Sequence, residues 1–185
     1  MAHAAAEPNA GGGNTMVAIG SAAGACIAAA LGLAGVVPWA TAPVATVLAA
    51  NALLFEGARI AVRLWEARSR EHSGFATGVS FEVLGGIGGI ALGVLAIAGL
   101  APSRSVALAT ALLGSALILG SRSHTRANAS AASSRVELTC GIAAVALGVA
   151  ALLGVEPRVL GLSGIAAVGA SVLVVSSTAA RRRGP

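Results

Sequence analysis

Apolar residues form long runs along this chain, and short polar or proline-containing segments separate the runs. Six runs of about 20 residues take up most of the sequence, and about 20 apolar residues in a helix cross ~30 Å of hydrocarbon. The runs at 84–101 and 138–155 lack the polar face that a helix of a soluble bundle presents to water. The pattern predicts an all-α fold, a polytopic membrane helix bundle of six transmembrane helices.

The segment 82–121 recurs 55 positions later, at 137–176, with 13 identities in 40 positions and no gap. Rare residues hold the register, because a glutamate opens both copies and a Gly-x-x-Pro turn stands in the middle of both. A fainter copy precedes them at an offset of 64. Three copies of one unit predict three helical hairpins in tandem. The matched pairs include Glu82 with Glu137, Pro102 with Pro157 and, in the first copy, Pro38 with Pro102.

These signals divide the chain into one membrane domain, residues 15–177, and two tails. Residues 1–14 are rich in Ala, Gly and Asn without periodicity, which predicts a flexible N-terminal tail. Residues 178–185 are expected to form a basic C-terminal tail. Two prolines predict a turn from Pro38 to Pro43. The predicted hairpins cover 15–64, 80–121 and 135–177.

Composition and charge agree with a membrane protein, because 56% of the residues are hydrophobic and only 10% are charged. With six spans, ten arginines fall on the side of the two termini, and two, Arg104 and Arg158, fall on the side of the proline turns. The positive-inside rule then predicts cytoplasmic termini in a multi-pass protein of the bacterial inner membrane. The net charge of +5 therefore indicates the lipid bilayer as partner, not nucleic acid.

The second predicted span carries a polar arc formed by Asn51, Glu56, Arg59 and Arg63. In the simpler interpretation, the two arginines reach the membrane surface and Glu56 pairs with Arg59 where the span ends. In the second interpretation, Asn51 and Glu56 belong to a polar path between helices.

Glu82 and Glu137 stand where the third and fifth spans are expected to begin. A glutamate in a first helical turn accepts hydrogen bonds from unpaired backbone amides and faces the positive end of the helix dipole, so we predict a capping role for both. The competing hypothesis is a pair of proton-accepting carboxylates at the membrane entrance.

Glycines recur at every fourth position of the third span, at Gly85, Gly89 and Gly93, and Gly148 continues a similar row in the fifth. Small residues at this spacing let helix backbones approach closely in lipid. We expect these glycines to lie at contacts between hairpins.

The sequence offers little for catalysis. It contains no aspartate, so no Ser-His-Asp set exists, and His3, His72 and His124 lack metal-ligand spacing. Cys26 and Cys140 fall within apolar runs, where packing is their expected role. We expect no enzyme activity, no metal and no cofactor.

Glycine, proline and serine punctuate the two clear copies at the same positions. These are Gly86, Gly93, Gly99, Pro102, Gly114 and Ser121, restated as Gly141, Gly148, Gly154, Pro157, Gly169 and Ser176. The pattern resembles that of the HdeD-like acid-resistance membrane proteins, whose hairpin repeats recur in a six-span inner-membrane protein. The resemblance covers about 80 to 177 and implies a role in stress or acid tolerance without an established catalytic site. The first hairpin departs from the pattern, because Ala18 stands at the position of Glu82, and Asn51 and Glu56 are additions.

Three functions follow as hypotheses. The first is a non-enzymatic inner-membrane protein of the HdeD type, with an envelope or acid-stress role or a structural one, as a monomer or homo-oligomer. The second is an accessory subunit that packs its glycine-rich faces against a larger membrane complex. The third is a small transporter or proton path through Asn51, Glu56, Glu82 and Glu137.

Overall fold

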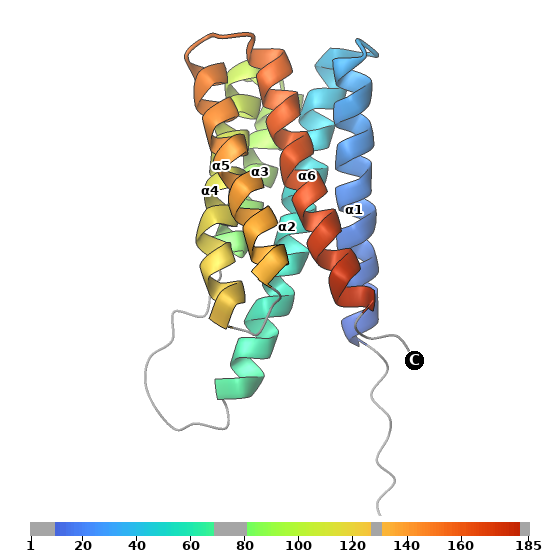
Figure 1. Cartoon of the computed structure of the whole chain (residues 1–185). Helices are drawn as coiled ribbons and strands as arrows, with labels where there is room; N and C mark the ends of the chain where they lie inside the picture. The colour runs from blue at the N-terminus through green and yellow to red at the C-terminus, as the bar shows by residue number, and fades with distance from the viewer. Residues whose placement is uncertain (1–9, 69–80, 127–130, 182–185) are drawn as a thin grey trace, which may run out of the picture.

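The computed structural model describes residues 10–68, 81–126 and 131–181, and every secondary-structure element in these ranges is an α-helix. Figure 1 shows the helices running up and down in one bundle, two for each predicted hairpin. The all-α prediction is therefore confirmed. The helices are α1 (Ala10–Leu33), α2 (Pro38–Arg68), α3 (Phe81–Ile97), α4 (Pro102–Arg126), α5 (Ala131–Leu152) and α6 (Pro157–Arg181).

Several helix ends lie outside the predicted boundaries. Helix α1 begins at Ala10, inside the stretch predicted to be a flexible tail, and α6 continues to Arg181, past the predicted end at 177. Alanine has the highest helix propensity, and alanines occupy the extended end of α6 at 179 and 180. Residues 1–9 and 182–185 of the two predicted tails lie outside the described residues.

The predicted turn from Pro38 to Pro43 is wrong. The chain turns before Pro38, and α2 runs from Pro38 straight through Pro43. Pro38 occupies the first helical position, where a missing N–H has no intrahelical partner to lose. Pro43 lies close to the same end, so its missing N–H affects the start of the helix and not its middle.

The three hairpin turns share one backbone conformation. In each turn the N–H of the glycine bonds to the carbonyl three residues back, and the next N–H bonds to the carbonyl five residues back, which is the Schellman motif. The last residue before each proline also has a positive φ. The first hairpin therefore has the same turn as the two clear copies. The φ values are 81°, 80° and 90° at Gly35, Gly99 and Gly154, and 40°, 44° and 36° at Val37, Ala101 and Glu156.

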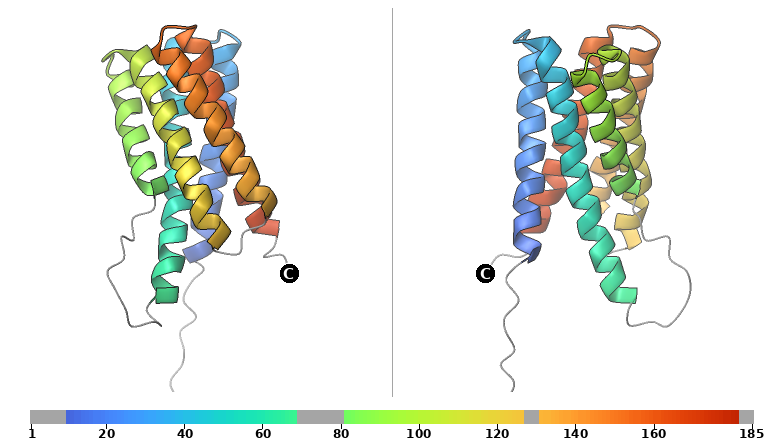
Figure 2. Two further views of the ribbon diagram at one scale, coloured as in Figure 1. Left: turned by 60° about the vertical axis from the view of Figure 1, so that its left-hand side comes forward. Right: turned by 180° about the vertical axis from the view of Figure 1, so that it is seen from behind.

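The hairpins are arranged with approximate threefold symmetry. The second helices of the hairpins, α2, α4 and α6, contact one another in the centre. Each first helix lies in a groove between two of them: α1 between α2 and α6, α3 between α2 and α4, and α5 between α4 and α6. Figures 1 and 2 show this bundle from three sides. Every hairpin therefore contributes one inner and one outer helix.

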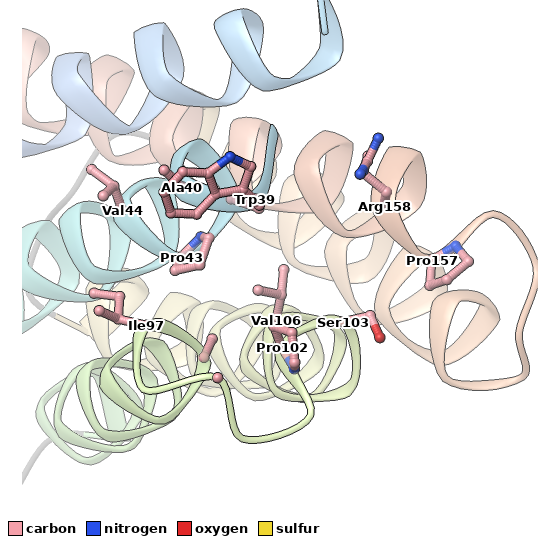
Figure 3. A pocket seen from close by; sticks show the side chains of 13 residues that line it. Trp39, Ala40, Pro43, Val44, Ile97, Pro102, Ser103, Val106, Pro157 and Arg158 are labelled. Carbon is pink, nitrogen blue, oxygen red and sulfur yellow. The ribbon is translucent and has the colours of Figure 1, made fainter. Parts of the chain in front are cut away.

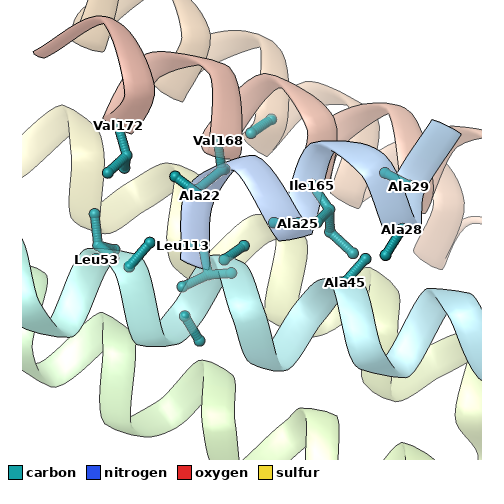
Figure 4. Packing of buried hydrophobic residues seen from close by; sticks show 14 of the residues in the cluster. Ala22, Ala25, Ala28, Ala29, Ala45, Leu53, Leu113, Ile165, Val168 and Val172 are labelled. Atoms are coloured by element: carbon teal, nitrogen blue, oxygen red, sulfur yellow. The ribbon is translucent and has the colours of Figure 1, made fainter. Parts of the chain in front are cut away.

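Small side chains fill most of the core. The buried face of α1 is formed by alanines such as Ala22, Ala25 and Ala29, which meet Ile165 and Val168 of α6 (Figure 4). Close backbone approach is most evident between α4 and α5, where a Cβ atom on Gly148 would lie 2.7 Å from the amide nitrogen of Ala111. Such contacts gain packing energy where lipid removes the hydrophobic drive for helix association.

The exterior of the bundle is apolar, with large side chains such as Ile27, Ile87 and Leu153 exposed. Five helices contain an apolar stretch of 19 to 22 residues, which is long enough to cross a bilayer. The sixth, α3, is also apolar, and its 17 residues are at the lower end of spanning lengths. The chain is a multi-pass integral membrane protein.

Candidate functional site

Three glutamates, one from each hairpin, are buried inside the bundle. Glu56 of α2, Glu82 of α3 and Glu137 of α5 are 3%, 2% and 3% exposed. Ionisable side chains at membrane depth are costly, and they commonly mark functional positions. We refer to these three residues as the acidic layer, and it is the candidate functional site.

Glu82 packs against a glycine of the neighbouring inner helix. A Cβ atom on Gly120 of α4 would lie 2.8 Å from the Cδ atom of Glu82, so the absence of a side chain at Gly120 makes room for the carboxyl. One turn further along α3, Gly85 faces Leu53 of α2 as well as α4. Glu82 does lie in the first turn of α3, as predicted. Its side chain is nevertheless directed into the groove between two inner helices.

Glu56 connects two inner helices. The hydroxyl of Ser176 in α6 donates a hydrogen bond to Oε2 of Glu56 in α2, with an oxygen–oxygen distance of 3.2 Å. Both residues are buried. The structure therefore places Glu56 inside the bundle, and the predicted pairing with Arg59 involves a side chain outside the described residues.

Glu137 is not at a helix start, and the predicted capping position is wrong. Helix α5 begins at Ala131, and its first turn contains no acidic residue. Alanine and serine at 131–134 extend the helix past the predicted start, which puts Glu137 in the second turn. Near this end, the Ser134 hydroxyl donates to the carbonyl of Ser121 at 3.3 Å and joins α5 to α4.

The repeat register places the three acids in one cross-section of the bundle. Glu82 and Glu137 are equivalent at the offset of 55. Glu56 is equivalent, at the offset of 64, to Gly120, which is the residue against which Glu82 packs. Measured from Pro38, Glu56 lies about 27 Å along α2 at a rise of about 1.5 Å per residue. The acidic layer thus lies at the opposite end of the spans from the proline turns.

The first hairpin carries its acid on the other helix. In the second hairpin, the acid Glu82 lies on the outer helix and the small residue Gly120 on the inner one. In the first hairpin, the equivalent outer residue is the buried Ala18, and the equivalent inner residue is Glu56. The acid has changed helices, and its level in the bundle has stayed the same.

Asn51 lies between Glu56 and the proline end of α2 and joins α2 to α1. Its Nδ2 donates a hydrogen bond to the Ser21 hydroxyl, at 2.9 Å. The other two members of the predicted polar arc, Arg59 and Arg63, belong to α2, and their side chains lie outside the described residues. Sequence reasoning found Glu56 and Asn51 but missed their partners Ser176 and Ser21. The recurrence of a serine at 121 and 176 was the available signal for one of them.

The predicted packing glycines lie at helix contacts. Gly85 contacts α4 and α2, Gly89 contacts α2 and α4, and Gly93 contacts α2. Gly148 meets the backbone of α4 at Ala107 and Ala111. These contacts occur within the bundle and hold the outer helices in their grooves.

A second feature, the proline-end pocket, lies where the inner helices begin. Its volume is about 410 Å³, and Figure 3 shows its side chains coming from α2, α4 and α6, with the end of α3 completing the wall. The lining residues are Trp39, Ala40, Ala42, Pro43, Val44, Ala96, Ile97, Gly99, Pro102, Ser103, Val106, Pro157 and Arg158.

Metal-binding side chains do not gather in the part of the chain that the structure describes, where no group of three His, Cys or Glu side chains occurs. His3 and His72, and the side chain of His124, lie outside it. Cys26 and Cys140 are free thiols on α1 and α5. The thiol of Cys26 lies 3.8 Å from the carbonyl of Ala166, a contact between α1 and α6.

Comparison with known proteins finds no match to a family model, to a curated protein or to a solved structure.

Proposed function

We propose that the protein is a non-enzymatic inner-membrane protein of the HdeD type, acting in envelope or acid stress, with both termini in the cytoplasm. The observation that carries the proposal is the acidic layer, in which each of three hairpins contributes one carboxyl at most 3% exposed. Gly120 lies beside Glu82, and the Ser176 hydroxyl bonds to Glu56. Such an arrangement suits a proton-responsive element better than a catalytic centre.

The response to acid would follow from the shared level of the three carboxyls. Acid that reaches this layer would change its charge, and we propose that the packing of the hairpins responds to that change. In the proposed orientation, the acidic layer lies at the cytoplasmic end of the spans, because the chain ends and the arginine-rich connections lie on that side.

Survival of an acid shock tests this function. A strain lacking the protein is expected to survive poorly, and the wild-type gene is expected to restore survival. The variant Glu56→Gln/Glu82→Gln/Glu137→Gln keeps the size of the side chains and removes their titration, so it should restore little. Membrane levels of the variant, measured by immunoblot, serve as the control. Equal survival with and without the protein would reject the acid-stress role.

A small transporter or proton path is the second candidate, and the hydrogen bond between Asn51 and Ser21 favours it. Asn51 extends the polar groups of α2 from Glu56 toward the middle of the bundle. Beyond it, Leu113, Ile165 and Val168 are fully buried and close the centre. A path would therefore need a second conformation. Proton flux into liposomes that carry the purified protein, and its loss in Glu56→Gln and Glu82→Gln, is the expected signature, and unchanged flux would remove these residues from the path.

The accessory-subunit hypothesis has less support. It rested on glycine-rich faces that meet a partner, yet Gly85, Gly89, Gly93 and Gly148 contact helices of the same chain. A stoichiometric large partner after purification in mild detergent would revive it. A monomer or homo-oligomer agrees with the proposed function.

A further inference from the structure

The proline-end pocket is built from equivalent positions of the repeat, and it is distinct from the acidic layer. Trp39, Ser103 and Arg158 each follow the proline that opens an inner helix, and they match one another at the offsets of 64 and 55. The equivalent residues of all three repeat units therefore line the same pocket. They carry an aromatic ring, a hydroxyl and a guanidinium, so the repeat has diverged in chemistry at this place.

The pocket exists because the next turn of the inner helices carries unequal side chains. Val106 of α4 is equivalent to Ala42 of α2 and to Gly161 of α6. A Cβ atom on Gly161 would lie 3.2 Å from Cγ1 of Val106, so valine reaches toward the glycine and forms the floor. Ala42 lines the pocket with a side chain of one carbon, which leaves space above this floor. A volume of about 410 Å³ is within the ~300–1,000 Å³ range of small-molecule sites.

The polar groups of the lining lie at the first turns of the inner helices. Pro43, Ile97 and Val106 supply aliphatic walls, whereas the Trp39 indole, the Ser103 hydroxyl and the Arg158 guanidinium carry hydrogen-bond donors. No acidic residue lines the pocket. A guanidinium presents a planar fork that matches carboxylate geometry. Charge and polarity therefore favour a ligand with an anionic head and an apolar tail.

We propose that the proline-end pocket binds a single-chain amphiphilic carboxylate of the fatty-acid class. The carboxylate lies at Arg158 and Ser103, and the chain packs against Val106, Pro43 and Ile97. The position agrees with this ligand, because the first turns of membrane-spanning helices lie near the interface where the head of an amphiphile meets water. The single guanidinium of Arg158 matches one carboxylate, and the single apolar cavity has room for one acyl chain.

Decanoate binding to the protein in phosphatidylcholine nanodiscs tests the affinity. Trp39 lines the pocket and reports occupancy by its fluorescence once the second tryptophan is replaced, as Trp65→Phe. Decanoate is expected to change the emission with a saturable dependence on concentration. Arg158→Gln should weaken the apparent affinity about tenfold, the effect of losing one charge-assisted hydrogen-bonded pair. Arg104→Gln is the matched control, because Arg104 lies on the same turn side and does not line the pocket.

Photolabelling tests the location of the same ligand. A decanoic acid that carries a terminal diazirine should label residues 42–44 and 96–106, and excess decanoate should compete more strongly than decanol. Val106→Phe fills the pocket and should abolish this labelling, and Arg158→Gln provides a milder variant that leaves the core unchanged. The proposal is wrong if Arg158→Gln binds decanoate as the wild type does, if decanol competes equally, or if the label spreads evenly over lipid-facing residues.

Discussion

Helices α1 and α3 hold equivalent places in the bundle, yet they use different residues to fill them. Each is an outer helix in a groove between two inner helices, and the same four positions of each are buried. In α1 these positions are alanines, whereas in α3 they are one glutamate and three glycines. The matched residues are Ala18 with Glu82, Ala22 with Gly86, Ala25 with Gly89 and Ala29 with Gly93.

The difference shows what sets the depth of each outer helix in its groove. A Cβ atom on Gly86 would lie 2.9 Å from the carbonyl oxygen of Ala50, and one on Gly148 would lie 3.0 Å from that of Ala107. Backbone thus meets backbone at α3 and α5. Helix α1 keeps its Cβ atoms on this face, and the glycine of its contact lies on the inner helix instead: a Cβ atom on Gly169 of α6 would lie 3.2 Å from the carbonyl oxygen of Ala22. Either the outer or the inner helix can therefore supply the glycine that allows close approach.

The largest effect is expected where the approach is closest. Gly148→Leu puts a Cβ atom 2.7 Å from the Ala111 nitrogen and drives α5 away from α4. We expect a loss of ~3 kcal/mol or more, at or beyond the upper end for overpacked cores. The melting temperature in detergent measures it. Gly20→Leu on α1 is the matched control, because a Cβ atom there meets nothing within 4 Å. Equal melting temperatures for the two variants would contradict the packing account.

Moving the acid tests the exchange between the first and second hairpins. Glu56→Ala deprives the Ser176 hydroxyl of its acceptor, and we expect a loss of ~1–3 kcal/mol in the free energy of unfolding. Ala18→Glu alone adds a second buried acid to the first hairpin and should also destabilise the protein. In the double variant, the acid occupies the outer helix, as in the other hairpins. The loss of unfolding free energy in the double variant should be smaller, by roughly 1–3 kcal/mol, than the sum of the losses in the two single variants.

If the losses of the two single variants add up to the loss of the double variant, the side chains at positions 18 and 56 do not occupy the same site in the bundle. Equilibrium unfolding in mixed micelles supplies the free energies. Ala22→Glu with Glu56→Ala is a suitable control, because residue 22 lies one turn deeper and should give no rescue.

The sequence was sufficient to predict the helices and their pairing into hairpins, but not to predict where the glutamate side chains point. Lipid forces every backbone group into a helix, so run length and the Gly-x-x-Pro register determined the number and pairing of the spans. Glu82 fits a capping role and a buried role equally well, because both place it in the first turn. Choosing between them requires knowing that α4 lies opposite with Gly120. The order of hairpins around the bundle sets that neighbour, and helical periodicity contains no information about it.

A smaller effect is expected at Ser176, which joins α6 to the acid of α2. Ser176→Ala removes a hydroxyl that donates to Glu56, and a typical intramolecular hydrogen bond contributes ~0.5–1.5 kcal/mol. Melting in detergent should detect this loss. The neighbouring Ser177→Ala is the control, because the Ser177 hydroxyl is exposed and bonds to the Val174 carbonyl of its own helix. We expect that variant to melt like the wild type, and equal losses for both would exclude a specific contact between α2 and α6.

The smallest effect concerns the turns, where all three hairpins agree. Ala101 has a φ of 44°, a left-handed conformation that a Cβ atom makes unfavourable. Ala101→Gly relieves this strain, but it also adds freedom to the unfolded chain, so the two effects partly cancel. We expect a change within ~1 kcal/mol. Gly99→Ala has no such compensation, because its φ of 80° suits glycine alone, and it should lower the melting temperature. If the turns are true copies, Gly35→Ala and Gly154→Ala will lower it by the same amount, whichever helix carries the acid.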